Sequence, residues 1–312
     1  MSGHPDDLLE AYAFGDCADP SVAAHVGSCG SCVALVAAAV RVAGWLGAAH
    51  FETPPASLRS RVVTAARSAR APSDSSALDA YAAEVASLGS LLNGLSPADW
   101  RAPVLGGRTV AVLVSHLAAN DAQVSADLGL PPSPPLSAPA AHWRVESDRL
   151  LRIVGSRNDL LGHPVRLAGR VPMRRPLREA LTQRAFETWI HDSDVRAAVS
   201  LPPVAPSPVH LARIVAFGLT LLPGAMDLAG RGRPGASVTL QLTGPGGGAQ
   251  VVSLSGADPG RGRPVAGVRM PAERFGRLMA GRVPVAESAA SIDGDRAVAL
   301  DLLTVAATLG CE

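Results

Sequence analysis

The sequence predicts a mainly α-helical protein that ends in a small α/β region. Apolar residues recur every three or four positions through most of the chain, which is the spacing of amphipathic helices. Hydrophobic residues make up 47% of the chain and aromatic residues only 4%, so Ala, Val and Leu must form the core. Beyond residue 236, two alternating segments flank a glycine-rich turn, which predicts a β-hairpin. With 312 residues, the chain is long enough for more than one domain.

The first 70 residues predict a small helical domain. We expect its helices over residues 6–14, 21–26, 32–49 and 55–70. The last of these begins with a proline near its first turn, where proline is well tolerated. Residues 68–76 are small and polar, and they predict a linker to the next domain.

Residues 74–200 predict a larger helical domain. Its strongest helix covers residues 77–95, where apolar residues at positions 78, 81, 85, 88 and 92 share one face. Two more helices are expected over residues 109–128 and 177–199. Residues 131–139 between them are rich in proline and predict a long loop.

Residues 201–312 predict a third domain of mixed type. Four prolines within residues 201–208 must end the preceding helix. We expect a helix next, then the hairpin, and then two further helices. These elements cover residues 208–229, 237–242 with 250–254, 271–280 and 296–309.

Composition excludes several classes of protein. The 28 basic residues, all arginine, and the 27 acidic residues give a net charge of +1, so no bulk field attracts nucleic acid or an anionic membrane. The N-terminus lacks the basic region of a signal peptide. The longest apolar stretch, residues 33–49, is interrupted by Arg41 and is too short to span a bilayer. We therefore expect a cytoplasmic protein.

A first candidate metal site lies near the N-terminus. His25, Cys29 and Cys32 have the spacing H-x3-C-x2-C, in which two thiolates can share one tetrahedral zinc ion and the histidine adds a third ligand. The fourth ligand could be His4 or Cys17. The alternative interpretation is a helix end with two buried cysteines.

The residues around this motif extend the interpretation. His4, the Leu-Leu-Glu-Ala-Tyr-Ala run at residues 8–13, Gly15 and the H-x3-C-x2-C motif resemble the zinc-binding domain of anti-sigma factors. Residues 54–63 resemble the last helix of that family, which packs on the sigma factor. The resemblance implies that His4 is the fourth zinc ligand and that a sigma factor is the partner. It also implies that Cys17 could pair with a C-x2-C thiol as a redox switch, while a small buried residue is the alternative role.

A second candidate metal site lies in the middle domain. Glu187 and His191 are four residues apart on one predicted helix, so they project from the same face, and His116 lies on another helix. Two imidazoles and a carboxylate suit zinc or another divalent metal, and three protein ligands leave one coordination position open. The alternative is an exposed Glu-x3-His pair that only stabilises its helix.

Three segments around these residues resemble the mycothiol-dependent maleylpyruvate isomerase family. They are residues 95–103, 109–121 and 184–196. The resemblance implies a DinB-like four-helix bundle with His116, Glu187 and His191 as metal ligands, Asp194 as a supporting acid, and mycothiol as a possible cofactor. This sequence has Arg108 where the family usually has a tryptophan.

The C-terminal domain continues the same resemblance. Residues 237–242, 271–282 and 292–295 resemble the small sterol-carrier-like α/β domain of that family. Gly281 and Arg282 match a recurrent Gly-Arg pair, so Arg282 could face the metal and bind a substrate carboxylate, as a catalytic residue if the protein is an enzyme. The alternative role for Arg282 is a surface cation at the end of a helix.

Two functions follow from these sites. The first is a zinc-binding anti-sigma factor that sequesters an extracytoplasmic-function-type sigma factor, with the bundle as a metal-binding sensor. The second is a mycothiol-dependent isomerase or thiol transferase with an accessory zinc module. A structural zinc protein that only mediates contacts is a third. The sequence favours the regulator, because an anti-sigma module needs a regulated effector domain and an open metal site is a suitable sensor.

Overall fold

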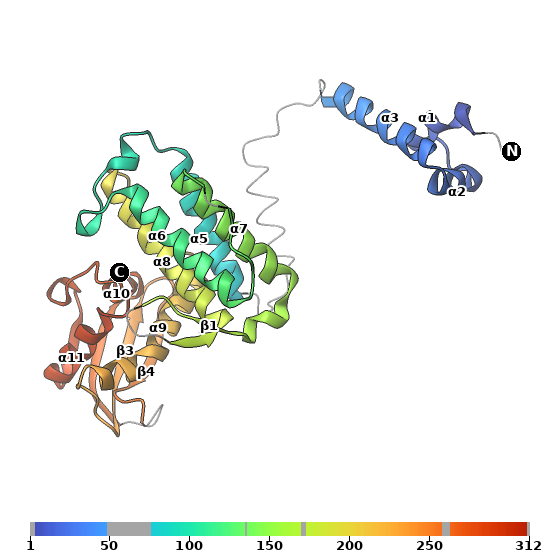
Figure 1. Cartoon of the computed structure of the whole chain (residues 1–312). Coiled ribbons are helices and arrows are strands. Elements are labelled where there is room, and N and C mark those ends of the chain that lie inside the picture. Colours follow the sequence, from blue (N-terminus) through green and yellow to red (C-terminus); the bar gives the residue numbers. More distant parts are fainter. Residues whose placement is uncertain (1–3, 49–75, 135, 170–172, 258–262, 311–312) are drawn as a thin grey trace. The chain divides into compact units, whose positions relative to one another are not determined.

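The computed structural model describes residues 4–48, 76–134, 136–169, 173–257 and 263–310. The chain forms two compact units, residues 1–71 and 72–312. The described elements are mainly helices, with a small mixed sheet near the C-terminus, as the sequence predicts (Figure 1). The helix predicted over residues 55–70 and nearly all of the linker over 68–76 lie outside the described residues.

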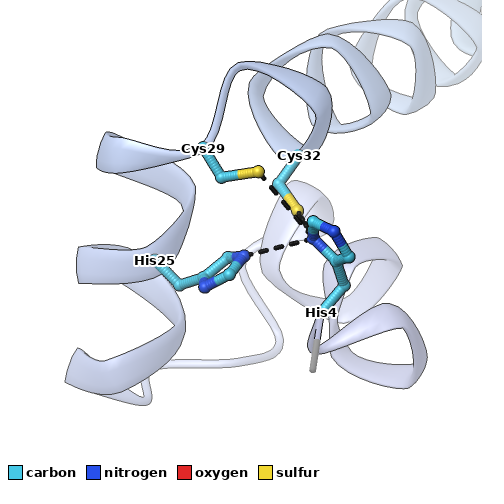
Figure 2. A group of neighbouring side chains, drawn as sticks. All are labelled: His4, His25, Cys29 and Cys32. Carbon is cyan, nitrogen blue, oxygen red and sulfur yellow. Dashed lines mark hydrogen bonds between the residues drawn. The ribbon is translucent and has the colours of Figure 1, made fainter. Parts of the chain in front are cut away.

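The first unit contains three helices, α1 (Asp6–Phe14), α2 (Pro20–Ser28) and α3 (Gly30–Ala48). Helix α1 ends at Gly15, whose φ of 81° lies in the left-handed region that glycine adopts at low cost. Helices α2 and α3 are separated at Cys29, whose extended backbone turns the chain sharply (Figure 2). The described core of this unit is small, and its buried apolar residues are Leu9, Val22, Val26 and Cys32.

The second unit begins with a bundle of four helices. They are α5 (Ser76–Asn93), α6 (Val110–Asp127), α7 (Pro139–Ser156) and α8 (Leu177–Ala198). The long side chains Tyr81, Trp143 and Leu181 are each at most 1% exposed in its core. The connections carry the short helices η1 (Asp99–Arg101), η2 (Leu105–Gly107) and η3 (Asn158–Gly162), and the antiparallel strands β1 (Pro164–Arg166) and β2 (Arg174–Pro176).

Helix α7 forms in a segment for which the sequence predicts no element. This helix begins at Pro139, the residue that closes the predicted proline-rich loop. Its buried positions have helical spacing, but two of them are polar, Glu146 and Ser147. The apolar repeat is therefore interrupted, and the pattern does not predict the helix.

The rest of the second unit is a four-stranded mixed sheet covered by helices. Its elements are α9 (Pro208–Leu228), β3 (Ala236–Thr243), β4 (Gly248–Ser253), β5 (Arg263–Pro271), α10 (Ala272–Met279), η4 (Val285–Glu287), β6 (Ser291–Gly294) and α11 (Arg296–Ala306). The strand order is β4-β3-β5-β6, with β3 and β5 parallel. The predicted hairpin is confirmed as β3 and β4, which pair antiparallel.

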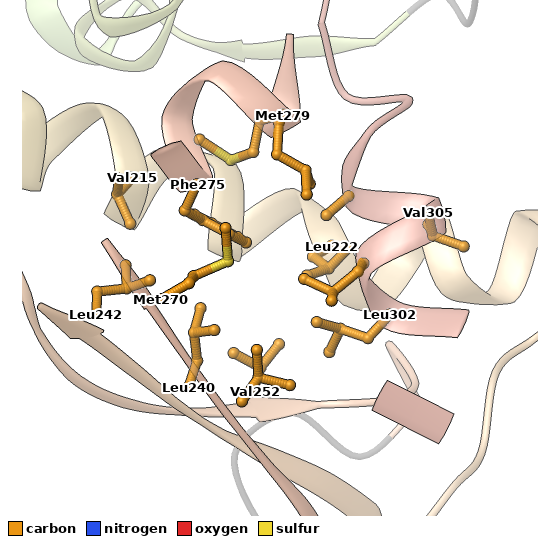
Figure 3. Close-up of a cluster of buried hydrophobic side chains, with 14 of the residues drawn as sticks. Val215, Leu222, Leu240, Leu242, Val252, Met270, Phe275, Met279, Leu302 and Val305 are labelled. Atoms are coloured by element: carbon orange, nitrogen blue, oxygen red, sulfur yellow. The ribbon is translucent and has the colours of Figure 1, made fainter. Parts of the chain in front are cut away.

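Side chains from the helices and from the sheet meet in one apolar core. Figure 3 shows Val215 and Leu222 of α9, Phe275 of α10 and Leu302 of α11 around Leu240 of β3. Trp189 of α8 also belongs to this core, so the bundle and the sheet share packed side chains.

One described helix, α9, has the length and apolar composition of a membrane span. Its mean hydropathy is 1.5 over the most apolar window. Leu211, Ile214 and Leu222 of this helix are at most 2% exposed and pack into the core of the mixed sheet. Helices α2 and α3 reach such a length only as a pair bent by 108°. A buried core helix accounts for the composition of α9.

Candidate metal sites

The first unit brings together four metal-binding side chains from different elements. His4 precedes α1, His25 lies on α2, Cys29 lies between α2 and α3, and Cys32 is in the first turn of α3. One ligand atom of each residue lies within 4.8 Å of the other three (Figure 2). The sharp turn at Cys29 is what allows the histidine of α2 and the cysteine of α3 to face the same point.

The spacing of these atoms fits tetrahedral zinc. Nδ1 of His4 lies 3.3 Å from Nε2 of His25, 3.2 Å from Sγ of Cys32 and 3.8 Å from Sγ of Cys29. Ordinary Zn–N and Zn–S bond lengths place ligand atoms about 3.3 Å apart for two nitrogens and about 3.6 Å apart for nitrogen and sulfur. The donor set and its spacing therefore suit a closed, four-ligand metal site.

Two further cysteine properties bear on this cluster. A hydrogen bond from the backbone N–H of Cys32 lowers the pKa of the Cys29 thiol, which favours the thiolate that binds metal. Cys17, the alternative ligand in the sequence analysis, is outside the group of four and packs against the small core of the unit.

The second candidate site lies between α6 and α8 in the bundle. The ring centroids of His116 and His191 are 5.8 Å apart, with the rings nearly perpendicular. Glu187 and His191 are each 3% exposed on α8, so they are not the exposed helix pair that was the alternative interpretation. Burial lowers the pKa of His116, although the Glu187 carboxylate opposes this, and the imidazole is held in its neutral, ligand form.

Two atoms of this site that could bind a metal have no hydrogen-bond partner among the described residues. They are Oε1 of Glu187 and Nε2 of His191, and both are inaccessible to solvent. Buried polar atoms are nearly always satisfied, so each such atom needs an explanation. Both are atoms that bind divalent metals.

The remaining contacts show that the site is not closed. The Asn120 amide donates to Nε2 of His116 at 3.1 Å and to Oε2 of Glu187 at 3.0 Å. Arg184 also donates to Oε2 of Glu187. Within the described residues, the four-residue cluster of the first unit is the one group whose ligand atoms all lie within 4.8 Å. The donor atoms of His116, Glu187 and His191 are therefore more widely spaced.

A carboxylate and a guanidinium support His191. Nδ1 of His191 lies 2.9 Å from Oδ2 of Asp194, and Arg282 binds both oxygens of the same carboxylate at 3.0 and 2.8 Å. Burial raises the pKa of Asp194, but the hydrogen bonds from His191 and Arg282 outweigh it and hold that pKa below its usual value. Arg282 thus lies beside His191 with its guanidinium engaged by Asp194, and a role toward a substrate carboxylate stays a prediction.

Sequence reasoning missed the buried polar network below this site. Tyr81 donates to Oδ2 of Asp121 at 2.7 Å, and Nε of Arg184 lies 3.1 Å from Oδ1 of Asp121. Arg184 also pairs with Glu187, so one guanidinium holds two carboxylates in the bundle core. The signal that could have predicted this network is the position of Arg184 and Asp121, which the helical repeat places on buried helix faces.

Comparisons with known proteins find solved structures to which this chain is distantly similar. No family model matches the chain, and no curated protein matches it. Two solved structures are similar, a mycothiol-dependent maleylpyruvate isomerase and a mutant of that enzyme. Each is 19% identical and covers 67% of this chain and 90% of its own, with TM-scores of 0.39 for the enzyme and 0.43 for the mutant.

Proposed function

We propose that this protein is a metal-dependent enzyme that uses a small thiol, with His116, Glu187 and His191 as the ligands of a divalent metal ion. The observation that carries the proposal is the pair of buried donor atoms, Oε1 of Glu187 and Nε2 of His191, that have no partner in the described part of the chain. Leaving such an atom unsatisfied costs about 1–3 kcal/mol. A cation bound between them removes that cost.

The surroundings of the three residues suit a metal site. The contact with Asp194 occupies Nδ1 of His191 and leaves Nε2 as the donor atom, which is how supporting carboxylates orient histidine ligands. Metal binding at Nε2 of His116 requires loss of the hydrogen bond from Asn120. When bound, the ion supplies Lewis-acid chemistry, including deprotonation of a coordinated thiol at neutral pH. Three protein ligands leave a position open for that thiol or for substrate.

The identity of the thiol rests on the sequence. The resemblance of residues 95–103, 109–121 and 184–196 supports mycothiol as the thiol, and isomerisation or thiol transfer as the reaction. The cluster of the first unit supplies four ligands, so we assign it a structural zinc ion with no open position. In this proposal the protein binds two metal ions, and only the ion in the bundle takes part in the reaction.

The test combines metal analysis with a thiol-dependent assay on the full chain. We expect two ions per chain in the wild type and one in His191→Ala, together with loss of mycothiol-dependent turnover of maleylpyruvate in the variant. His142→Ala removes a histidine of α7 outside both sites and should change neither quantity. A wild-type chain that holds a single ion and has no thiol-dependent activity would contradict the proposal.

A second candidate function, binding of a sigma factor by the first unit, is favoured by a separate observation. Large apolar side chains on α1 and α3 are exposed in this small unit. They are Leu8, Phe14, Val33, Leu35, Val40 and Val42, between 42% and 58% exposed. Exposed apolar side chains that share one face of a helix are typical of protein-binding surfaces. The zinc-held helices are in this view an anti-sigma module that sequesters an extracytoplasmic-function-type sigma factor.

Leu35 and Val42 allow a direct test of this second candidate. The two residues are seven positions apart and so share one face of α3. Leu35→Asp and Val42→Asp should each abolish co-purification with a co-expressed sigma factor, whereas Ala34→Asp adds the same charge elsewhere on the helix and should not. Failure of the wild type to co-purify with any sigma factor of its own cell would remove this candidate.

A further inference from the structure

The side chain of Asn120 lies against the candidate metal site of the bundle. Asn120 is four residues after His116 on α6, so the two side chains share one face of that helix. Its amide nitrogen lies 3.1 Å from Nε2 of His116 and 3.0 Å from Oε2 of Glu187 on α8. One amide group therefore contacts two of the three residues that we propose as metal ligands.

The contacts of Glu187 fix the direction of both hydrogen bonds. Oε2 of Glu187 also accepts from Arg184, so it is an acceptor, and the group of Asn120 that faces it must be the NH2 group. The second N–H of that group donates to Nε2 of His116, which must then carry a lone pair. The proton of the neutral imidazole is therefore on Nδ1. Asn120 thus occupies the lone pair by which Nε2 of His116 would bind a metal ion.

The other two residues of the site each keep a ligand atom that no hydrogen bond occupies. These atoms are Oε1 of Glu187 and Nε2 of His191, which have no partner in the described part of the chain. Glu187 can bind an ion through Oε1 while Oε2 keeps its contact with Arg184. Among the hydrogen bonds of the described residues, the one from Asn120 to His116 is therefore the one that an ion must replace.

Asn120 has room to release this contact. Its side chain is half-buried, whereas Glu187 and His191 are each 3% exposed. When the amide turns towards water, it exchanges a protein hydrogen bond for one to water. The net contribution of one neutral hydrogen bond corresponds to about three- to tenfold in an equilibrium constant. The amide can therefore turn away from His116 at a moderate cost.

We propose that Asn120 is a positioning residue that competes with the metal ion for His116. The inference rests on the proposed function, because it assumes a metal ion bound by His116, Glu187 and His191. Only molecules whose amide has turned away can accept the ion, so the competition weakens the apparent affinity and slows association. Once the ion occupies Nε2 of His116, the contact with Asn120 is gone. The rate of dissociation should therefore not depend on this amide.

Zinc titration of the full chain tests the proposal, after one equivalent of zinc has filled the cluster of the first unit. Asn120→Ala should bind the second ion about three- to tenfold more tightly than the wild type, because no hydrogen bond competes for His116. Stopped-flow mixing should show the same gain in the association rate, with an unchanged rate of dissociation into excess chelator. Asn93→Ala removes an exposed asparagine of α5 and should change none of these quantities.

A purely structural role for Asn120 predicts effects of the opposite sign. Alanine is the best helix former, so Asn120→Ala should fold, and circular dichroism checks this. If the wild type binds two ions and Asn120→Ala binds the second one equally or more weakly, or releases it faster, the competition is refuted and the metal site stands. If wild type and variant both hold a single ion, the inference fails together with the proposed function.

Discussion

His191 and Asp194 lie one helical turn apart on α8, and Nδ1 of the histidine is 2.9 Å from Oδ2 of the aspartate. Arg282, from the loop after α10, donates to both oxygens of the same carboxylate. The sheet-bearing part of the second unit thereby fixes the orientation of a histidine in the bundle. Nε2 is left as the donor atom of that ring.

Asp194→Asn should weaken metal binding in the bundle about 10–100-fold, the usual effect of losing a carboxylate behind a histidine ligand. The measurement is a competition titration with a chromophoric zinc chelator. Asp159→Asn is the matched control, because that carboxylate is exposed and pairs with Arg157, which precedes η3. If both variants bind metal as the wild type does, Asp194 has no part in the site.

Cys32→Ser should unfold the first unit and leave the second intact. The described core of that unit has four buried apolar residues, one of which is Cys32 itself, so its folding free energy must come largely from the metal. Far-ultraviolet circular dichroism should lose the signal of α1 to α3 only. Cys17→Ser changes a cysteine that is not among the four clustered residues, and it should keep the helices and the zinc. A fully helical Cys32→Ser variant would show that packing alone holds the unit.

The sequence predicted the elements whose core faces are apolar. The helix expected over residues 6–14 has the same bounds as α1, which ends at a glycine. The hairpin at residues 237–254 matches β3 and β4 closely, because alternating apolar residues flank a glycine-rich turn. Strand β5 was missed although Ala266, Val268 and Met270 alternate and are buried. Helix α7 was missed because buried Glu146 and Ser147 interrupt its repeat.

The candidate sites differ in how far sequence could specify them. H-x3-C-x2-C and His4 predicted a cluster that the fold brings together, because short-range spacing within α2 and α3 fixes most of its geometry. In the bundle, Glu187 and His191 were predicted on one face, but the contacts of Asn120 and Arg184 depend on how α6 and α8 pack together. No local pattern specifies such long-range pairing.

Glu84 should make the stability of the second unit depend on pH. Burial, with a smaller contribution from Asp192, raises the pKa of this carboxyl from 4.5 to about 7. The folded state therefore binds the proton more tightly than the unfolded state. The resulting stability is fully present below pH 4.5 and is lost as the pH rises to about 7, by at most on the order of 3 kcal/mol.

Urea unfolding of wild type and Glu84→Gln at a series of pH values checks this expectation. The wild type should lose stability relative to the variant between pH 4.5 and 7, and the difference should then be constant. Asp121 also has a raised pKa, about 6, and it titrates in both proteins, so the comparison isolates Glu84. A difference that does not change with pH would mean that Glu84 ionises normally.

Arg184→Met should be among the most destabilising substitutions in the bundle. The guanidinium is 2% exposed and pairs with both Asp121 and Glu187, which are equally buried. Methionine fills much of the space but leaves two carboxylates without a cation, and removing one member of a buried ion pair costs about 3–5 kcal/mol. Arg157→Met breaks an exposed pair with Asp159 and should cost far less, because solvent screens a surface ion pair. Zinc should recover part of the loss in Arg184→Met, because the cation would compensate Glu187. Thermal unfolding of both variants with and without zinc measures these effects, and equal losses in the two variants would show that the buried network contributes no more than a surface pair.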